Sequence, residues 1–433
     1  MFAGIFDIGT LKKRFKLIFF IYIHFKSMFE FINAAIGSFF QTLLAVVWII
    51  LPIFLFALFW TLRLYQKRIE FISKVKWIML ELKPPKDLIK TPKSMEQVFS
   101  SFYGIYSGGI KWHEKYLDGK VDLWMSLEMV GRGGGTHFYL RCPAQFRNLA
   151  EAAIYAQYPD VEIVETQDYT EEMPEVLPNE IWDLWGGGFT LVKNNAYPIR
   201  TYPYFEEVKE EKRIDPISNI AEAMSKLKDD EMIWIQLLIS PAGAQTENDL
   251  KKECEDEIKK IVDSTREEKS SGETISLGMW KLTPSQQDVI KAIGNKGTKM
   301  SFQFSLRAVY IDKKNEFTMS NVAALRSAFQ LFNTSDLNAL KGDKLSTSYG
   351  KFWGRIFPWY KQFQVNSKKR RMYDYYRKRK FGYSGRLVSE SLPILNTEEL
   401  ATLFHFPAGV VKAAKLQTIY SRKGEPPANL PIE

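Results

Sequence analysis

A long uncharged stretch near the N-terminus constrains this chain more than any other feature of its sequence. Residues 32–62 contain no charged side chain, and residues 43–60 read LLAVVWIILPIFLFALFW. A helix of about 20 residues rises about 30 Å, which matches the hydrocarbon thickness of a bilayer. Because the stretch is apolar on every face and begins too far along for a cleavable signal peptide, it predicts a transmembrane helix over residues 39–64 rather than a buried core helix. The residues expected in the span are Leu43, Trp48, Pro52, Phe56 and Trp60.

Basic residues flank the apolar stretch on both sides. They are Lys12, Lys13, Arg14, Lys16 and Lys26 before it, and Arg63, Lys67, Arg68, Lys74 and Lys76 after it. Residues 1–38 are expected to be an amphipathic segment, with a helix over 11–31 on the bilayer surface or, alternatively, a re-entrant hairpin. Because the numbers of basic residues on the two sides are equal, the positive-inside rule does not decide the orientation of the span. Because the chain has two cysteines and no disulfide pattern, we expect a single-pass protein of the cell membrane with its bulk in the cytoplasm.

The body after the span is expected to be α+β, built from two ferredoxin-like modules. Within residues 65–180 the pattern predicts a strand at 77–82, a helix from Pro92, two alternating strands over 121–142 with a glycine turn at 131–135, a helix over 146–154 and a strand at 161–164. This β-α-β-β-α-β order is that of the ferredoxin-like fold, in which two helices cover one face of an antiparallel sheet.

A second module is expected over residues 181–340. Its predicted elements are a glycine bend at 185–188, strands at 189–193, 232–239 and 300–310, and helices at 215–227 and 318–332, while a closing strand is not evident. Residues 242–296 are expected to be a helical insertion. Its helix, at about 247–265, is charged on most of its surface, so it projects into solvent and either contacts a partner or is simply solvated.

Residues 341–390 differ in composition and are expected to form a basic, aromatic linker. The stretch 351–386 contains twelve Lys or Arg residues and one acidic residue, Asp374, whereas the net charge of the whole chain is +9. Such a segment can contact the phosphates of nucleic acid or anionic lipid, or it can be a solvated linker. The residues expected on this anionic-partner surface are Lys368, Lys369, Arg370, Arg371, Arg377, Lys378, Arg379 and Lys380.

No catalytic or metal-binding motif is recognisable. The Gly-Lys pairs at Gly119 and Gly350 lack the Ser or Thr of a P-loop, so the Walker motif is missing. The four histidines are scattered singly, and no Cys/His pair has metal-ligand spacing. His137 and His405 lie beside aromatic residues and are expected to be packed rather than catalytic. We therefore expect no enzymatic activity, no cofactor and no metal.

Several blocks of the sequence together resemble a known family. They are WIMLELKPPKDLIKTPKSMEQVF (77–99), DPISNIAEAMSKLKDDEMIWIQLLISP (215–241), LPILNTEELATLFHFPAGVVKAAKL (392–416) and GEPPANLP (424–431). These blocks are similar to the N-terminal membrane-anchored region of bacterial type IV secretion-like, conjugative DNA-transfer ATPases. The resemblance implies a transmembrane helix and α+β domains, with residues 392–416 leading into a RecA-like ATPase domain. Because this sequence stops at Glu433, the resemblance implies either a split system, with a P-loop ATPase on a separate chain, or a stand-alone accessory protein.

The segment 391–433 is expected to provide a docking site for that partner. Asn396 or Thr397 can cap a short helix that Pro407 ends. The apolar residues expected at the docking edge are Leu400, Leu403, Phe404 and Phe406, with packing onto the second module as the alternative.

Together with the resemblance, these patterns predict a membrane-anchored, non-catalytic assembly or scaffold component of a type IV secretion-like, conjugative DNA-transfer machine. The alternative is a membrane-tethered nucleic-acid-binding protein that uses residues 351–386. The expected partners are the lipid bilayer, the separate P-loop ATPase, DNA and a second copy of the chain.

Overall fold

The computed structural model describes residues 8–407, except for residues 86, 87, 89, 107, 206–214, 268–281, 344, 345, 348–357 and 382–391. The chain divides into two compact units, Met1–Leu64 and Tyr65–Glu433. The predicted docking segment therefore lies outside the described residues from position 408 onward, as do Lys351, Arg355 and Arg386 of the basic stretch.

One antiparallel sheet forms the centre of the second unit, and the predicted α+β class is confirmed. Its nine strands are β1 (Trp77–Lys83), β2 (Met125–Arg132), β3 (Gly135–Pro143), β4 (Glu162–Thr166), β5 (Trp182–Leu191), β6 (Met232–Pro241), β7 (Ser301–Lys313), β8 (Leu340–Gly342) and β9 (Ile394–Asn396). The closing strand that the sequence did not reveal is β8, which has only three residues.

The strand order across the sheet is β4-β1-β3-β2-β6-β7-β5-β8. Strands β2 and β6 join the strands of residues 65–180 to those of residues 181–340, with Glu128 opposite Gln236. Strand β5 pairs with the second half of β7, and β9 pairs with its first residues, Ser301 to Gln303. The sheet is therefore continuous across both predicted modules.

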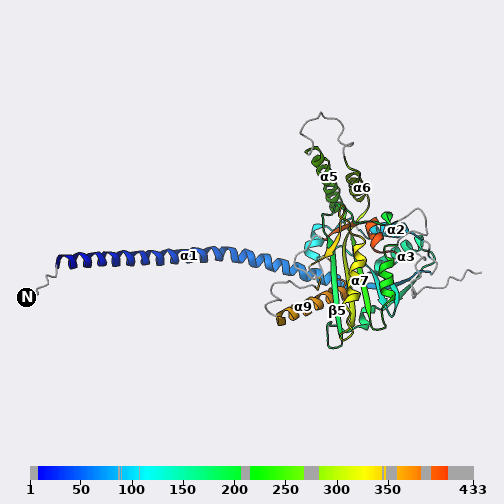
Figure 1. Cartoon of the computed structure of the whole chain (residues 1–433), viewed down its shortest axis with the longest axis horizontal. Helices are drawn as coiled ribbons and strands as arrows, with labels where there is room; N and C mark the ends of the chain where they lie inside the picture. Colours follow the sequence, from blue (N-terminus) through cyan, green and yellow to red (C-terminus); the bar gives the residue numbers. More distant parts are fainter. Residues whose placement is uncertain are drawn as a thin grey trace, which may run out of the picture. The chain divides into compact units, whose positions relative to one another are not determined.

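Most helices cover one face of this sheet. They are α2 (Pro92–Phe102), α3 (Arg147–Gln157), α4 (Ser218–Ser225), α7 (Met319–Gln330) and α10 (Thr397–Leu403) (Figure 1). Because side chains alternate along a strand, Leu127, Met129 and Leu306 point to this face and form the main core with the apolar stripes of the helices. Pro92 occupies the first turn of α2, as predicted. Short helical turns also occur at Tyr103–Ile105, Glu114–Asp118, Ala144–Phe146, Tyr169–Glu172 and Tyr202–Tyr204.

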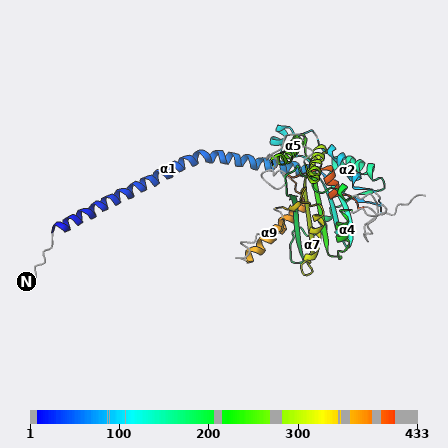
Figure 2. The ribbon, with the colours of Figure 1, turned by 45° about the horizontal axis from the view of Figure 1, so that its top comes forward.

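The last turns of helix α9 (Pro358–Arg377) pack on the opposite face of the sheet, and the first part of the helix extends away from it (Figure 2). Its Met372 and Tyr376 pack with Val130, Trp234 and Val309, which alternate with the residues of the main core. Much of the described part of the predicted basic linker is therefore helical, and its last turns are packed because Tyr373, Tyr375 and Tyr376 are buried, whereas Phe363 is 69% exposed. The predicted glycine bend at 185–188 is also wrong. These glycines lie inside β5, where a Cβ at position 186 would collide with the Met372 side chain.

The predicted helical insertion is a pair of helices, α5 (Ala244–Glu267) and α6 (Pro284–Thr298), which project side by side (Figure 1). Leu250, Cys254 and Ile258 of α5 pack with Ile293 of α6. The remaining face of α5 is largely exposed, as its sequence predicted.

Helix α1 runs without interruption from Ile8 to Lys74 and contains Pro52. The predicted surface helix over residues 11–31 is thus the first part of a longer helix, since no proline lies between it and the apolar residues 43–60. One segment, Ile50–Lys74, is long and apolar enough to cross a membrane, and its most apolar part is not buried by the rest of the described chain.

Candidate functional site

The residues expected in the membrane span lie on α1. Trp48 and Phe56 are 72% and 66% exposed, Trp60 is 36% exposed, and Pro52 lies within the helix. The side chain of Leu43 lies outside the described part of the chain. Large exposed apolar side chains gathered on one helix are typical of a surface that contacts a membrane or another protein.

The eight basic residues expected on one anionic-partner surface do not form one surface. Arg370, Arg371 and Lys378 are exposed. Lys369 forms an ion pair with Asp183 at 2.6 Å, and both Lys378 and Lys380 pair with Asp374 at 2.6 Å.

The remaining three basic residues are at least partly covered. Lys368 and Arg377 are half-buried. Arg379 is fully buried, so its assignment to the anionic-partner surface is wrong. It is buried because the tyrosines just before it pack onto the sheet and carry the end of α9 inward.

The docking edge expected at the C-terminus is also wrong. Leu400, Leu403, Phe404 and Phe406 are all buried, each at most 2% exposed. The alternative of internal packing is confirmed, but Phe404 and Phe406 pack edge-to-face against Phe138 in β3 rather than only against the second module. Asn396 caps α10 in a capping box with Glu399, one of the two caps that the sequence allowed.

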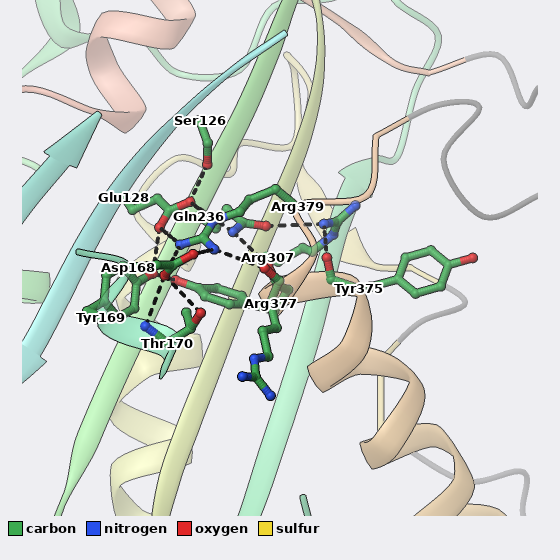
Figure 3. Close-up of polar contacts among 11 residues, drawn as sticks. Ser126, Glu128, Asp168, Tyr169, Thr170, Gln236, Arg307, Tyr375, Arg377 and Arg379 are labelled. Carbon is green, nitrogen blue, oxygen red and sulfur yellow. Dashed lines mark hydrogen bonds and ion pairs between the residues drawn. The ribbon is translucent and has the colours of Figure 1, made fainter. Parts of the chain in front are cut away.

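A buried polar cluster lies where the end of α9 meets the sheet (Figure 3). The cluster, called the α9 cluster below, consists of Glu128, Asp168, Gln236, Arg307 and Arg379. Arg379 donates from Nε and Nη2 to the two oxygens of Glu128, each at 3.0 Å. It also donates to both oxygens of Asp168, with one bond of 2.9 Å from Nη2, and from Nη1 to the carbonyl of Arg377 at 2.9 Å. All five N–H groups of this guanidinium therefore have an acceptor.

The cluster adds side-chain hydrogen bonds at the end of α9, where the carbonyls of Tyr375 and Tyr376 also accept from the backbone N–H groups of Lys380 and Arg379. Arg307 donates to the carbonyl of Tyr375 at 3.0 Å and to that of Lys380, and Gln236 donates to the carbonyl of Tyr376 at 3.1 Å. The final carbonyls of a helix have no partner inside the helix and carry a partial negative charge. Side-chain donors from β6 and β7 therefore fix the C-terminal end of α9 to the sheet.

The sheet supplies this cluster from one lateral row. Glu128 in β2 is opposite Gln236 in β6, and Gln236 is opposite Arg307 in β7. Gln236 donates to Glu128 at 3.0 Å and accepts from Arg307 at 3.1 Å. Asp168 comes from the turn before Tyr169, whose hydroxyl donates to Glu128 at 2.6 Å. Three adjacent strands and one turn thus converge on Arg379.

The charges within the α9 cluster stabilise each other. Burial alone would raise the pKa of the Glu128 carboxyl, but the Arg379 guanidinium outweighs that effect and holds the pKa below its usual value. The same balance lowers the pKa of Asp168. Burial raises the pKa of the Tyr169 and Tyr376 hydroxyls well above the ordinary value for tyrosine, so both remain neutral donors.

A second buried ion pair, called the α10 pair below, joins Lys296 of α6 to Glu399 of α10 at 2.9 Å. Both side chains are fully buried. The Lys296 ammonium also donates to the carbonyl of Ile394 at 3.1 Å, and Glu399 accepts from the backbone N–H of Ile199 at 2.9 Å. Here burial raises the pKa of Glu399 despite the nearby lysine.

The two histidines are packed, as predicted. His137 is bonded to Glu81 at 2.9 Å, and His405 lies between the carbonyl of Ala401 and Asp215. Both cysteines are buried as free thiols. Among the described residues, no group of three His, Cys, Asp or Glu side chains could hold a metal ion.

The sequence reasoning missed four members of the α9 cluster: Glu128, Asp168, Gln236 and Arg307. For three of them a signal was present. Glu128, Gln236 and Arg307 are polar residues inside otherwise apolar strands, and a polar group at such a position is normally buried with a partner. Asp168 gave no such signal, because it lies in a turn.

The geometry gives the α9 cluster a structural role. The Arg379 guanidinium pairs with two carboxylates and uses all of its donors, and the Arg307 guanidinium binds backbone carbonyls at the end of α9. The cluster therefore holds the end of α9 against the sheet.

A comparison with protein families found one match. A family model described as a domain of unknown function, DUF8128, matches residues 60–412, which include both the α9 cluster and the α10 pair. No curated protein matches the sequence.

Proposed function

The chain belongs to the DUF8128 family of unknown function, and we propose that it is a single-pass membrane protein whose body lies in the cytoplasm and serves as a non-catalytic assembly platform. The observation that carries this proposal is the exposed apolar surface of α1. Trp48, Ile53 and Phe56 are each more than 60% exposed, and the segment Ile50–Lys74 meets the length required for a span. A bilayer is the environment that covers such a surface on a helix.

The body of this platform would consist of two ferredoxin-like modules joined edge to edge. Counted inward from each edge of the sheet, the strands are β4-β1-β3-β2 and β8-β5-β7-β6. If the four strands of each half are numbered in chain order, both halves have the order 4-1-3-2 from the edge inward. The repeated order supports a duplicated module, with β2 and β6 forming the shared edge.

The platform is proposed to belong to a type IV secretion-like, conjugative DNA-transfer machine and to work with a P-loop ATPase on a separate chain. The support is the resemblance of the blocks at 77–99, 215–241 and 392–416. In the described part of the last block the apolar residues are buried, so an ATPase would contact another surface. The projecting α5–α6 pair is suited to that contact, because α5 keeps a long charged face exposed.

Membrane anchoring is tested by extracting cell membranes with alkaline carbonate. The full chain should remain in the pellet, and a variant lacking residues 39–64 should be released. A matched control replaces the same residues with a leucine-rich span of equal length, which should restore retention. Release of the full chain by carbonate would contradict the proposal.

The assembly role is tested by co-expression with a P-loop ATPase of the conjugative DNA-transfer type. We expect that ATPase to move to the membrane fraction only when the full chain is present, and to lose this association when residues 247–265 carry reversed charges. A control with reversed charges at Glu222 of α4 and at Lys226, which follows that helix, should leave the association intact. Membrane association independent of this chain would contradict the assembly role.

Nucleic-acid binding remains a second candidate, because Arg370 and Arg371 are exposed on α9. Its support is smaller than the sequence alone indicated, since Arg379 is buried and three of the lysines are in ion pairs.

A further inference from the structure

A cavity of about 680 Å³ opens at the end of the sheet where β1 begins and where β3 and β6 end. The end of α1 and the turns next to these strands form its walls. Its apolar lining includes Phe71, Val75, Ile110, Val121, Leu123 and Phe146. Its volume lies in the range of small-molecule sites, and its surface is suited to a flexible hydrocarbon chain.

Cations surround this apolar space. Lys74, Lys76 and Lys120 line the cavity, and a neighbouring cavity of about 250 Å³, which shares Tyr106 and Ile110 with it, adds Arg68 and Lys115. Against these five cations, the two linings contain a single carboxylate, that of Asp122. Nearby, Glu70 pairs with Lys74 and Glu114 with Lys120, and all four of these side chains are partly exposed. The lining therefore combines an apolar interior with a net positive rim.

The segment beside the cavities carries residues typical of a membrane interface. Trp112 is 68% and Leu117 is 50% exposed, although both are large and apolar. The same segment packs closely on α1, because a Cβ at Gly119 would lie 2.5 Å from the carbonyl carbon of Lys67. Tryptophan side chains are enriched where a bilayer meets water.

Basic residues follow the uncharged stretch of α1 within two turns of the helix. The uncharged stretch ends at Leu62, and Lys67 and Arg68 follow it by five and six residues. In a helix this separation is about 8–9 Å, comparable to the depth of the headgroup region. The inference therefore rests on the proposed membrane anchoring.

From these observations, we propose that the groove formed by the two cavities binds one anionic phospholipid, with an acyl chain in the apolar part and the phosphate near Lys76 and Lys120. The apolar lining matches the acyl chain, and the five cations, which outnumber the nearby carboxylates of Asp122, Glu70 and Glu114, match a headgroup with a net negative charge. Phosphatidylcholine has no net charge, so it gains less from this rim.

The test uses the full chain, purified in a mild detergent with equal amounts of phosphatidylglycerol and phosphatidylcholine, and native mass spectrometry to count retained lipids. We expect one phosphatidylglycerol per chain and at least a tenfold preference over phosphatidylcholine. Ala144→Phe, which fills the cavity without changing any charge, should reduce retention at least tenfold. Lys76→Glu combined with Lys120→Glu should abolish the preference.

The matched control combines Lys226→Glu with Lys259→Glu, which makes the same charge change at exposed residues that line neither cavity. It should retain the lipid. Unchanged retention by Ala144→Phe would show that basic residues attract anionic lipid without any need for the cavity. This result would overturn the proposed groove. Carbonate resistance of the same variants is measured in parallel. Its loss from the unaltered chain would overturn the membrane anchor instead, so the two failures are distinguishable.

Discussion

The α9 cluster and the α10 pair both fix a late segment of the chain to the body through a buried cation, but they do so differently. Arg379 meets two carboxylates with four hydrogen bonds and donates a fifth to the carbonyl of Arg377. Lys296 meets one carboxylate and the backbone carbonyls of Ile394 and Tyr197. The pKa values of Glu128 and Asp168 are lowered, whereas that of Glu399 is raised.

The comparison shows what determines whether the attraction within a buried ion pair exceeds the free-energy cost of removing its charges from water. A planar guanidinium presents its donors in a fixed fork and can satisfy two carboxylates at once. A single ammonium near one carboxylate leaves more of the desolvation cost uncompensated. Stability in the α9 cluster should therefore depend strongly on its charges, and stability around the α10 pair should depend on them less.

The largest effect is expected for Arg379→Met. This change leaves Glu128 and Asp168 buried without their cation, and removing one partner of a buried pair typically costs about 3–5 kcal/mol. Urea unfolding of the detergent-solubilised chain, followed by tryptophan fluorescence, measures the loss. Buried Trp234 contributes to that signal because it packs against Tyr376 of α9. The control is Arg371→Met on the exposed side of the same helix.

A smaller loss is expected for Lys296→Met, about 1–3 kcal/mol. The raised pKa of Glu399 means that its carboxyl can take up a proton when the lysine is absent, while the backbone N–H groups of Ile199 and Asn396 still donate to it. The same unfolding assay compares the two single variants. A loss for Lys296→Met equal to or larger than that for Arg379→Met would refute the proposed difference.

Acidification should change the free energy of unfolding still less, because the α9 cluster and the α10 pair contribute with opposite sign. Glu128 and Asp168 have lowered pKa values in the folded state, so their contribution is present above the ordinary carboxyl pKa and is lost as the pH falls below it. Glu399 has a raised pKa, so its contribution is present at low pH and is lost as the pH rises through the folded value.

Unfolding free energies measured between about pH 7 and pH 3 test this balance. We expect Glu399→Gln to steepen the loss of stability on acidification, since it removes the opposing contribution. Arg379→Met should flatten the loss. Identical pH profiles for the unaltered chain and both variants would contradict the assigned pKa directions.

The smallest stability effect is expected for Arg370→Gln combined with Arg371→Gln, within about 0.5 kcal/mol, because both side chains are exposed. The same variant addresses the nucleic-acid candidate. If α9 binds phosphates, the logarithm of the DNA-binding constant falls with the logarithm of the salt concentration. The steepness of this fall should decrease by about one for each arginine–phosphate interaction that the variant removes. Retention equal to that of the unaltered chain would exclude this face as the DNA-binding surface.

Local patterns predicted much of the fold. The alternation of Leu127 and Met129 identified β2, Pro92 marked the start of α2, and Asn396 was one of two caps proposed for α10. Each of these features depends on neighbours within a few residues. The insertion between β6 and β7 was also predicted as helical, because its apolar residues recur with helical spacing.

The α9 cluster could not be predicted in the same way. Arg379 and Glu128 are 251 positions apart in the sequence, and nothing local shows that they meet. The basic residues around Tyr375 and Tyr376 resemble a solvated surface until the sheet that buries these rings is known. The apolar residues of α10 were misjudged for the same reason, because both a docking edge and a core helix require such a stripe.

The central claim is that α1 crosses the membrane once and leaves the body in the cytoplasm. Cys142 and Cys254 are buried, so single cysteines introduced at Ser27 and Lys259 can be labelled selectively. In intact cells, a membrane-impermeant maleimide should label Ser27→Cys and should label Lys259→Cys only after the membrane is opened. Labelling of both positions from the same side of the intact membrane would contradict the account.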